Sequence, residues 1–224
     1  MVLRENPDLA FEPGRKFSYS NIGYWLLGKV VEQITGQSYS DYVRLNILKP
    51  LRLSTQEMDF SIPDESRHAN GYLKKYSLMN LVKGFVIDRK FVGSYEGNWL
   101  RLNSHYLNGP AFGGLIGTAR GFGRFLQDQL RVESVLFGLK SKSLLETRQT
   151  DGAGRPIPMT LGWHVGETHG VAYFFKEGGG GGFHCEMRIY PTQGIASVVL
   201  VNSTEFSTTE FLNRVDRTFV ESRQ

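Results

Sequence analysis

The chain has 224 residues, of which 40% are hydrophobic and 21% charged, values that are ordinary for a globular protein able to bury one sizeable core. Its formal net charge of +4 is modest and no arginine- or lysine-rich run is present, which disfavours nucleic acid as a partner. No stretch approaches the ~20 apolar residues of a membrane span, and the single cysteine, Cys185, excludes an internal disulfide and disfavours a cysteine-based metal site.

Residues 1–16 are predicted to be irregular, because Pro7, Pro13 and Gly14 interrupt any helix, and Met1 to Phe11 have no apolar signal-peptide core. The stretch FSYSNIGY, from Phe17 to Tyr24, then leads into an amphipathic helix over about 22–35. Ser20 or Asn21 suits its N-cap, and Gly36 is placed to end it in the left-handed conformation. Its apolar side chains fall on one face (Ile22, Leu26, Leu27, Val30, Val31 and Ile34).

A second helix is predicted from Ser38, with Asp41 three residues later in a capping-box arrangement and an end before Pro50. Residues 51–110 are expected to form a loop-rich excursion over a cleft, since long loops often line binding sites. Within it, residues 71–76 and 83–92 are predicted as strands, with 88–90 as a turn or bulge.

Gly113 to Thr118 reads as a tight apolar turn before a helix capped by Thr118, and a short helix is predicted near 141–149. The spacing of hydrophobic residues then changes to that of strands, which are predicted over 160–165, 171–176, 183–190 and 195–202. A last helix is predicted over about 208–221. Short turns between these strands favour antiparallel neighbours. No linker divides the chain, so we expect one α+β domain, an antiparallel sheet flanked by helices.

Two separated stretches carry candidate chemistry. Tyr19 and Asn21 lie at a loop-to-helix junction, where a phenol and an amide can act on a neighbouring group. Lys176 ends an apolar strand, and the following Gly178 and Gly179 would let a substrate lie against the backbone, whose N–H groups can stabilise an oxyanion. The alternative is a buried tyrosine, a capping asparagine and a glycine-rich hairpin with a solvated lysine. No Gly-Lys-Ser/Thr follows, which disfavours a phosphate-binding loop, and the five histidines show no metal-ligand spacing.

Taken in order, these motifs carry a family resemblance. The chain resembles the serine β-lactamase/penicillin-binding-protein-like hydrolases, most nearly the branch of class C β-lactamases, D-aminopeptidases and family VIII esterases. The similarity runs from about Phe11 to Asn202. It rests on Phe-x-Tyr-Ser-Asn-x-Gly-Tyr at 17–24, Gly-Gly-Leu at 113–115, Thr-Ala-Arg at 118–120, Leu-Gly-Trp at 161–163 and Lys-x-Gly-Gly-x-x-Gly-Phe at 176–183.

The resemblance implies an acyl-enzyme reaction on an ester, amide or β-lactam, without a cofactor. It implies that Tyr19 moves protons to and from the nucleophile and leaving group, and that Asn21 binds the acyl side of the substrate. Lys176 would place a positive charge beside Tyr19 and help to bind substrate, and the N–H of Gly179 would be one oxyanion donor.

The chain departs from the family pattern at the nucleophile. No lysine has a serine three residues earlier, so the Ser-x-x-Lys motif is missing, and eighteen residues precede Tyr19. We therefore expect the chain to correspond to the C-terminal part of the fold and to have little acyl-transfer activity by itself. The alternative is a catalytically inactive binding or interaction protein. With the leading strands of the fold absent, we expect the sheet to have an open edge, which invites an N-terminal segment or a second copy to pair with it.

A second departure is Glu177, at a position where the family usually has a hydroxyl residue. If its side chain faces the cleft, it repels a β-lactam carboxylate and favours neutral esters or amides. If strand alternation turns it away, it has no such effect.

Overall fold

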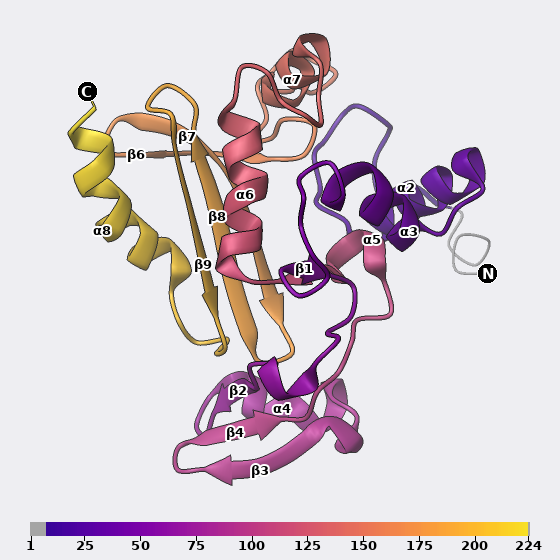
Figure 1. Cartoon of the computed structure of the whole chain (residues 1–224), viewed down its shortest axis with the longest axis vertical. Helices are drawn as coiled ribbons and strands as arrows, with labels where there is room; N and C mark the ends of the chain where they lie inside the picture. The colour runs from indigo at the N-terminus through magenta and orange to yellow at the C-terminus, as the bar shows by residue number, and fades with distance from the viewer. Residues whose placement is uncertain (1–7, 224) are drawn as a thin grey trace.

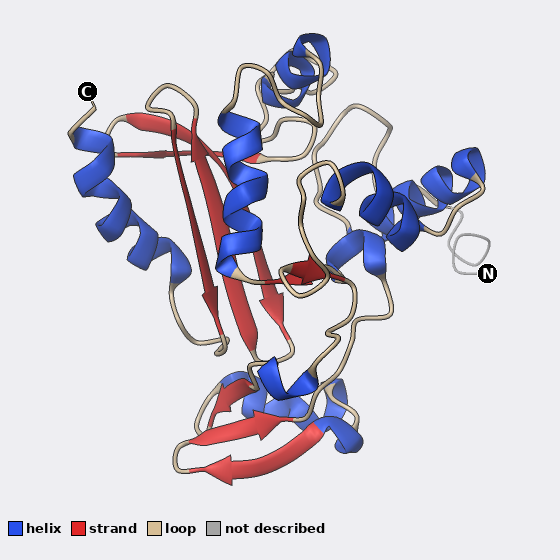
Figure 2. Cartoon of the chain, in the orientation of Figure 1, coloured by secondary structure: helices blue, strands red, loops and turns tan. Residues whose placement is uncertain are grey.

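The computed structural model describes residues 8–223 and centres on a four-stranded antiparallel sheet with one helix on each face (Figures 1 and 2). The strand order follows the sequence, so each strand pairs with the next through a hairpin. The sheet consists of β6 (His164–Thr168), β7 (Val171–Gly180), β8 (Phe183–Tyr190) and β9 (Ile195–Val201), and the helices are α6 (Ala119–Leu130) and α8 (Thr208–Glu221).

Strand alternation divides the core into two layers. Leu126 of α6 packs on Trp163 and Ile189 on one face, whereas Val220 of α8 packs on Tyr173 and Tyr190 on the other. This confirms the predicted α+β fold, the antiparallel sheet and the final helix. The first strand begins later than predicted, at residue 164 rather than 160, because Thr160 to Gly162 form a turn in which the hydroxyl of Thr160 accepts from the N–H of Trp163.

A buried ionic network fastens α8 to the sheet. Arg188 of β8 has no exposed surface, and its Nε lies 2.6 Å from a carboxylate oxygen of Glu186. It also donates to Oδ1 of Asn213 at 2.7 Å, while the hydroxyl of Tyr190 donates to Asp216 at 2.8 Å. A buried charge is costly unless it is paired and hydrogen-bonded, so this network makes the docking of α8 specific rather than merely apolar.

The N-terminal helices lie beside this sheet, and their ends follow the predicted signals. The hydroxyl of Ser20 caps α2 (Asn21–Thr35), and Gly36 closes it at φ 69°. Ser38 caps α3 (Tyr39–Val43), which continues as a π-helical turn over Arg44–Leu48, and α5 (Pro110–Gly113) packs against α2. Much of the apolar face of α2 stays exposed, including Leu27, Val30 and Ile34.

Residues 71–102 form a small three-stranded sheet with a helix, at one end of the long axis of the molecule (Figure 1). The strand order is β2 (Gly71–Lys74), β4 (Trp99–Leu102), β3 (Val92–Glu96). The predicted strand over 83–92 is wrong: α4 (Leu78–Val86) occupies its first part, and Asp88 caps a 3₁₀ turn before β3. The hydroxyl of Ser77 caps α4, which starts the helix before the apolar run that suggested a strand.

Four short elements complete the described chain: β1 (Met58–Asp59) pairs with β5 (Ile116–Gly117), a 3₁₀ turn covers Glu65–Arg67, and α7 (Leu139–Glu146) follows α6. The predicted turn at Pro13 and Gly14 is present, and residues 1–7 of the predicted irregular lead lie outside the described residues. No helix in residues 8–223 is long and apolar enough to cross a bilayer.

Candidate functional site

The loop-to-helix junction at the start of α2 presents the two predicted N-terminal residues. Ser20 has an extended backbone, and its hydroxyl accepts from the N–H of Gly23 at 3.1 Å, which satisfies one of the free donors of the first turn. Tyr19 precedes this cap and Asn21 is the first helical residue, and both side chains are exposed. Within the described chain, neither the Tyr19 hydroxyl nor the Asn21 amide has a hydrogen-bond partner, so both are open to a ligand.

Lys176 reaches the same place from β7, 157 positions further along the chain than Tyr19. Its Nζ lies 5.1 Å from the ring centroid of Tyr19 and 5.0 Å from that of Tyr24, and it donates to the Tyr24 hydroxyl at 3.3 Å. An ammonium over a tyrosine ring contributes roughly 0.5–1 kcal/mol when exposed and more when desolvated. The two ring centroids are 5.8 Å apart, so the cation lies next to both rings at once. We call Tyr19, Tyr24, Lys176 and the neighbouring His164 the Tyr19–Lys176 cluster.

Burial sets the electrostatics of this cluster. Desolvation lowers the pKa of Lys176, and the neighbouring Tyr19 opposes that effect in part. Desolvation also raises the pKa of the Tyr24 phenol. The lysine thus holds its proton less tightly than a solvated lysine does, which suits a group that must respond to charge on a neighbouring oxygen.

His164, on the edge strand β6, completes the cluster. Its ring centroid lies 5.9 Å from that of Tyr19 and 5.1 Å from that of Phe175. Burial lowers the pKa of His164, the Lys176 charge lowers it further, and Glu177 opposes both. Sequence reasoning assigned no role to Tyr24 or His164. For Tyr24 a signal existed, because it follows Asn21 by three residues and so lies on the same side of the helix.

Gly178 and Gly179 lie within β7, opposite Cys185 and His184 of β8. A Cβ added at Gly178 would lie 3.3 Å from the Cys185 sulfur, and one at Gly179 would lie 3.4 Å from the His184 ring. Neither position needs a positive φ. Gly178 therefore leaves the strand surface low on the face of Lys176, and Gly179 does so on the opposite face, that of Glu177.

The last two glycines of the run, Gly181 and Gly182, form the turn after β7 and anchor it. Gly181 and Gly182 have φ values of 60° and 82°, which L side chains rarely adopt. The N–H of Tyr72 donates to the carbonyl of Gly182 at 3.1 Å, and a Cβ at Gly182 would lie 2.6 Å from the Tyr72 nitrogen. This close backbone contact joins the end of β7 to the small sheet of residues 71–102.

Glu177 points away from the cluster. Adjacent strand residues face opposite sides of a sheet, and Glu177 lies on the α8 side while Lys176 faces the other. Its carboxylate lies 2.7 Å from Nε2 of His184, whose Nδ1 lies 2.8 Å from the carbonyl of Phe206. Of the two orientations left open by the sequence, the structure has the one in which Glu177 is turned away.

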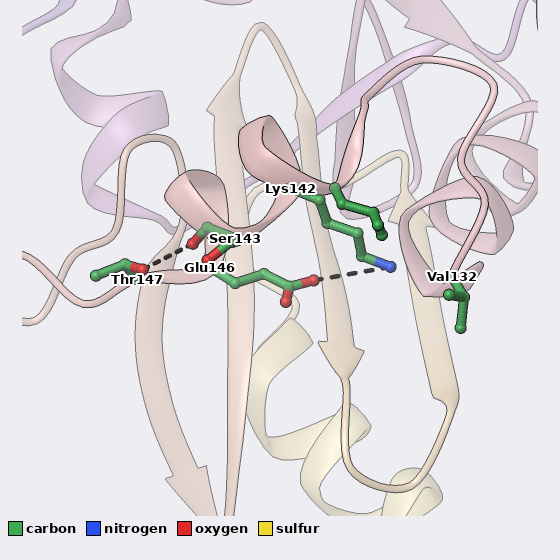
Figure 3. A pocket seen from close by; sticks show the side chains of 6 residues that line it. Val132, Lys142, Ser143, Glu146 and Thr147 are labelled. Atoms are coloured by element: carbon green, nitrogen blue, oxygen red, sulfur yellow. Dashed lines mark hydrogen bonds and ion pairs between the residues drawn. The ribbon is translucent and has the colours of Figure 1, made fainter.

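A shallow depression of about 400 Å³ lies elsewhere, against α7 (Figure 3). Lys142 and Glu146 point toward each other across one helical turn at 4.0 Å, and the Thr147 hydroxyl donates to the carbonyl of Ser143. These are contacts within a helix surface and include no residue of the Tyr19–Lys176 cluster. Among residues 8–223, no group of three or more His, Cys, Asp or Glu side chains is arranged to hold a metal ion.

One family model matches most of the chain. The model of the family described as Beta-lactamase matches residues 4–219. Protein flp of Staphylococcus aureus (strain N315) is 35% identical over 65 residues, which are 29% of this chain and 13% of that protein.

Solved structures extend the likeness to the whole fold. The octameric penicillin-binding protein homologue from Pyrococcus abyssi superposes with a TM-score of 0.75 at 20% identity, covering 98% of this chain and 47% of its own. The D-amino acid amidase from Ochrobactrum anthropi SV3 superposes with a TM-score of 0.72 at 19% identity, covering 96% of this chain and 62% of its own. The chain therefore spans about half to two thirds of these structures, and at this identity they show the fold alone.

Proposed function

Because this chain belongs to the Beta-lactamase family, we propose that it supplies part of a serine hydrolase site that cleaves an ester, amide or β-lactam through an acyl-enzyme. The observation that carries this proposal is the Lys176 ammonium, which lies about 5 Å from the ring centroids of both Tyr19 and Tyr24. These residues come from a helix start and a strand end far apart in the sequence, yet they converge at one exposed surface. The D-amino acid amidase among the solved structures favours an amide as the first substrate to test.

In this proposal Tyr19 is the proton carrier. Its oxygen takes the proton of a serine hydroxyl as the serine oxygen bonds to the acyl carbon, and it returns that proton to the leaving nitrogen or oxygen as the bond to the carbon breaks. Lys176, whose Nζ lies 5.1 Å from the Tyr19 ring centroid, places a positive charge beside Tyr19 during this exchange. Tyr24 is a positioning residue, since its hydroxyl accepts from the Lys176 ammonium. Asn21 donates its amide to the acyl side of the substrate, and the N–H of Gly179 stabilises the oxyanion.

The nucleophile is the part that this sequence does not contain, because no lysine follows a serine at Ser-x-x-Lys spacing. We therefore expect that the 224-residue chain forms no acyl-enzyme by itself and that a serine from another polypeptide segment completes the site. The same sequence feature favours a second candidate function, in which the chain binds an ester-like or amide-like ligand without cleaving it.

The sheet offers a place where such a segment could join. In the described chain β9 pairs only with β8, which leaves its other edge without a strand neighbour apart from the bridge of Tyr72 to Ser203. Unpaired N–H and C=O groups on a strand edge are a template for another strand. We propose that a further segment or a second copy of the chain pairs there.

Turnover and ligand binding test the proposal separately. With nitrocefin, a p-nitrophenyl ester and D-phenylalanine amide, we expect no hydrolysis above background by the chain, but a rise in melting temperature with ligand concentration. The rise should be lost in Tyr19→Phe, Asn21→Ala and Lys176→Met and kept in Tyr76→Phe, whose side chain lies elsewhere. Turnover that disappears in Tyr19→Phe would contradict the expected inactivity, and equal ligand shifts in all variants would contradict the site.

A further inference from the structure

Helix α4 is packed with its polar side inward. Asn80 is 2% exposed, whereas Leu78, Leu81 and Phe85 are 76%, 79% and 95% exposed. At 100° per residue these three side chains lie within one stripe of about 60°. A helix of a globular protein normally buries such a stripe against the core, so this face is available to something outside the chain.

Specific contacts hold the helix in this orientation. The Asn80 amide donates to the carbonyl of Lys74 at 3.1 Å, and its oxygen accepts from the Tyr95 hydroxyl at 3.1 Å. The Ser77 hydroxyl accepts from the N–H of Asn80 at 3.2 Å. Turning the apolar stripe inward would leave a buried hydrogen-bonded amide without its partners. The outward apolar face is thus built into the fold.

The same segment concentrates the positive charge of the protein. Residues 74–90 contain five cationic side chains and one anionic side chain, a net charge of +4 that equals the net charge of the whole chain. The rest of the chain therefore sums to zero. Lys75 lies 5.7 Å from the ring centroid of the exposed Tyr76, just before the helix. Lys83 lies on the other side of α4 from the stripe and donates to the carbonyl of Asn80, so the flanking cations are those at the two ends of the helix. The cationic residues are Lys74, Lys75, Lys83, Arg89 and Lys90, and the anionic residue is Asp88.

We propose that this α4 surface, formed by Leu78, Leu81, Phe85 and the flanking cationic residues, docks on an anionic phospholipid bilayer. An apolar stripe with aromatic side chains and a rim of lysine and arginine is the composition of a helix that lies in the membrane interface, where its apolar side chains enter the acyl boundary and its cations meet lipid phosphates. A nine-residue helix is about 14 Å long, too short to span the bilayer. A second copy of the chain fits this face less well, because pairing α4 with itself would bring two segments of net charge +4 together.

The position of the α4 surface agrees with this role. Residues 71–102 form one end of the long axis of the molecule, so a membrane can reach α4 without meeting the main sheet first (Figure 1). None of its residues belongs to the Tyr19–Lys176 cluster, and docking there leaves that cluster open.

Vesicle co-sedimentation of the full chain tests the proposal. We expect binding to vesicles of phosphatidylglycerol with phosphatidylcholine, weaker binding at high salt, and little binding to phosphatidylcholine alone. The variant Leu81→Ser/Phe85→Ser should bind about tenfold more weakly or worse, because full burial of one leucine side chain corresponds to more than one factor of ten. Lys75→Gln and Lys90→Gln should each weaken binding to the anionic vesicles about fivefold.

Leu139→Ser is the matched control, since Leu139 is 70% exposed on α7 and is the same residue type as Leu81. It should bind vesicles like the natural chain, and circular dichroism should show that all variants keep their fold. Absence of vesicle binding, equal binding by Leu81→Ser/Phe85→Ser, or an equal loss in Leu139→Ser would each overturn the proposal. The proposal would also be overturned if the chain does not bind vesicles but forms a dimer in sedimentation velocity that Phe85→Ser dissociates.

Discussion

Gly28 offers a sharp test of how α2, and with it Asn21 and Tyr24, is positioned. A Cβ built at Gly28 would lie 2.4 Å from the Cβ of Ala111 in α5, far inside the 3.5–4.0 Å of ordinary carbon contacts. Neither Cβ can rotate away, because both are fixed to helical backbones. Gly28→Ala therefore requires α2 and α5 to separate by about 1 Å.

Two effects oppose each other in this substitution. Alanine in a helix interior is about 0.8–1 kcal/mol more favourable than glycine. Overpacking a close contact costs typically about 1–3 kcal/mol, and the short distance here favours the upper end. We expect a net loss of about 2 kcal/mol in the free energy of unfolding, or a melting temperature lower by about 4–8 °C for a chain of this size.

Gly123→Ala is the control, because a Cβ at Gly123 in α6 meets nothing within 4 Å. It should stabilise the protein by about 1 kcal/mol through helix propensity alone. The double variant Gly28→Ala/Ala111→Gly should recover most of the loss, since the nearest remaining atom to the new Cβ is in the Tyr39 ring at 3.6 Å. Urea unfolding of the natural chain and the three variants measures these differences. If Gly28→Ala is as stabilising as Gly123→Ala, the expected clash between α2 and α5 at Ala111 is refuted.

Three further predictions concern charge. Arg188→Met should lower the free energy of unfolding by about 3–5 kcal/mol, because it leaves Glu186 and Asp216 buried without their cation; a urea midpoint like that of the natural chain would refute this. His164 has a lowered pKa in the folded state, so its stabilising contribution is present above about pH 6.5 and is lost as the pH falls through the folded value. Between pH 7.5 and 5 the melting temperature of the natural chain should therefore fall more than that of His164→Asn. Lys176 also has a lowered pKa, so the natural chain should gain stability relative to Lys176→Met as the pH rises through the folded value toward about 10.5, and a constant difference would count against a desolvated ammonium.

Local signals in the sequence were enough to predict where several helices begin or end. Ser20, Gly36, Ser38 and Thr118 act within one turn of the residues they cap, so the chain neighbours alone are enough to predict them. The antiparallel sheet was predictable for the same reason, because apolar strands separated by short turns pair with their neighbours. The family resemblance likewise rested on short motifs such as Tyr19-Ser20-Asn21.

Tertiary contacts decided the rest. The strand predicted over 83–92 is wrong because its first part belongs to α4, which the buried amide of Asn80 holds with its apolar side outward. The direction of Glu177 depended on the register of β7 against β8, which no local pattern specifies. Tyr24 and His164 joined Lys176 only through the packing of a helix against a sheet edge. Residues 140 or more positions apart meet because the chain buries its surface as a whole, and that is why their proximity, unlike a helix cap, had to come from the fold.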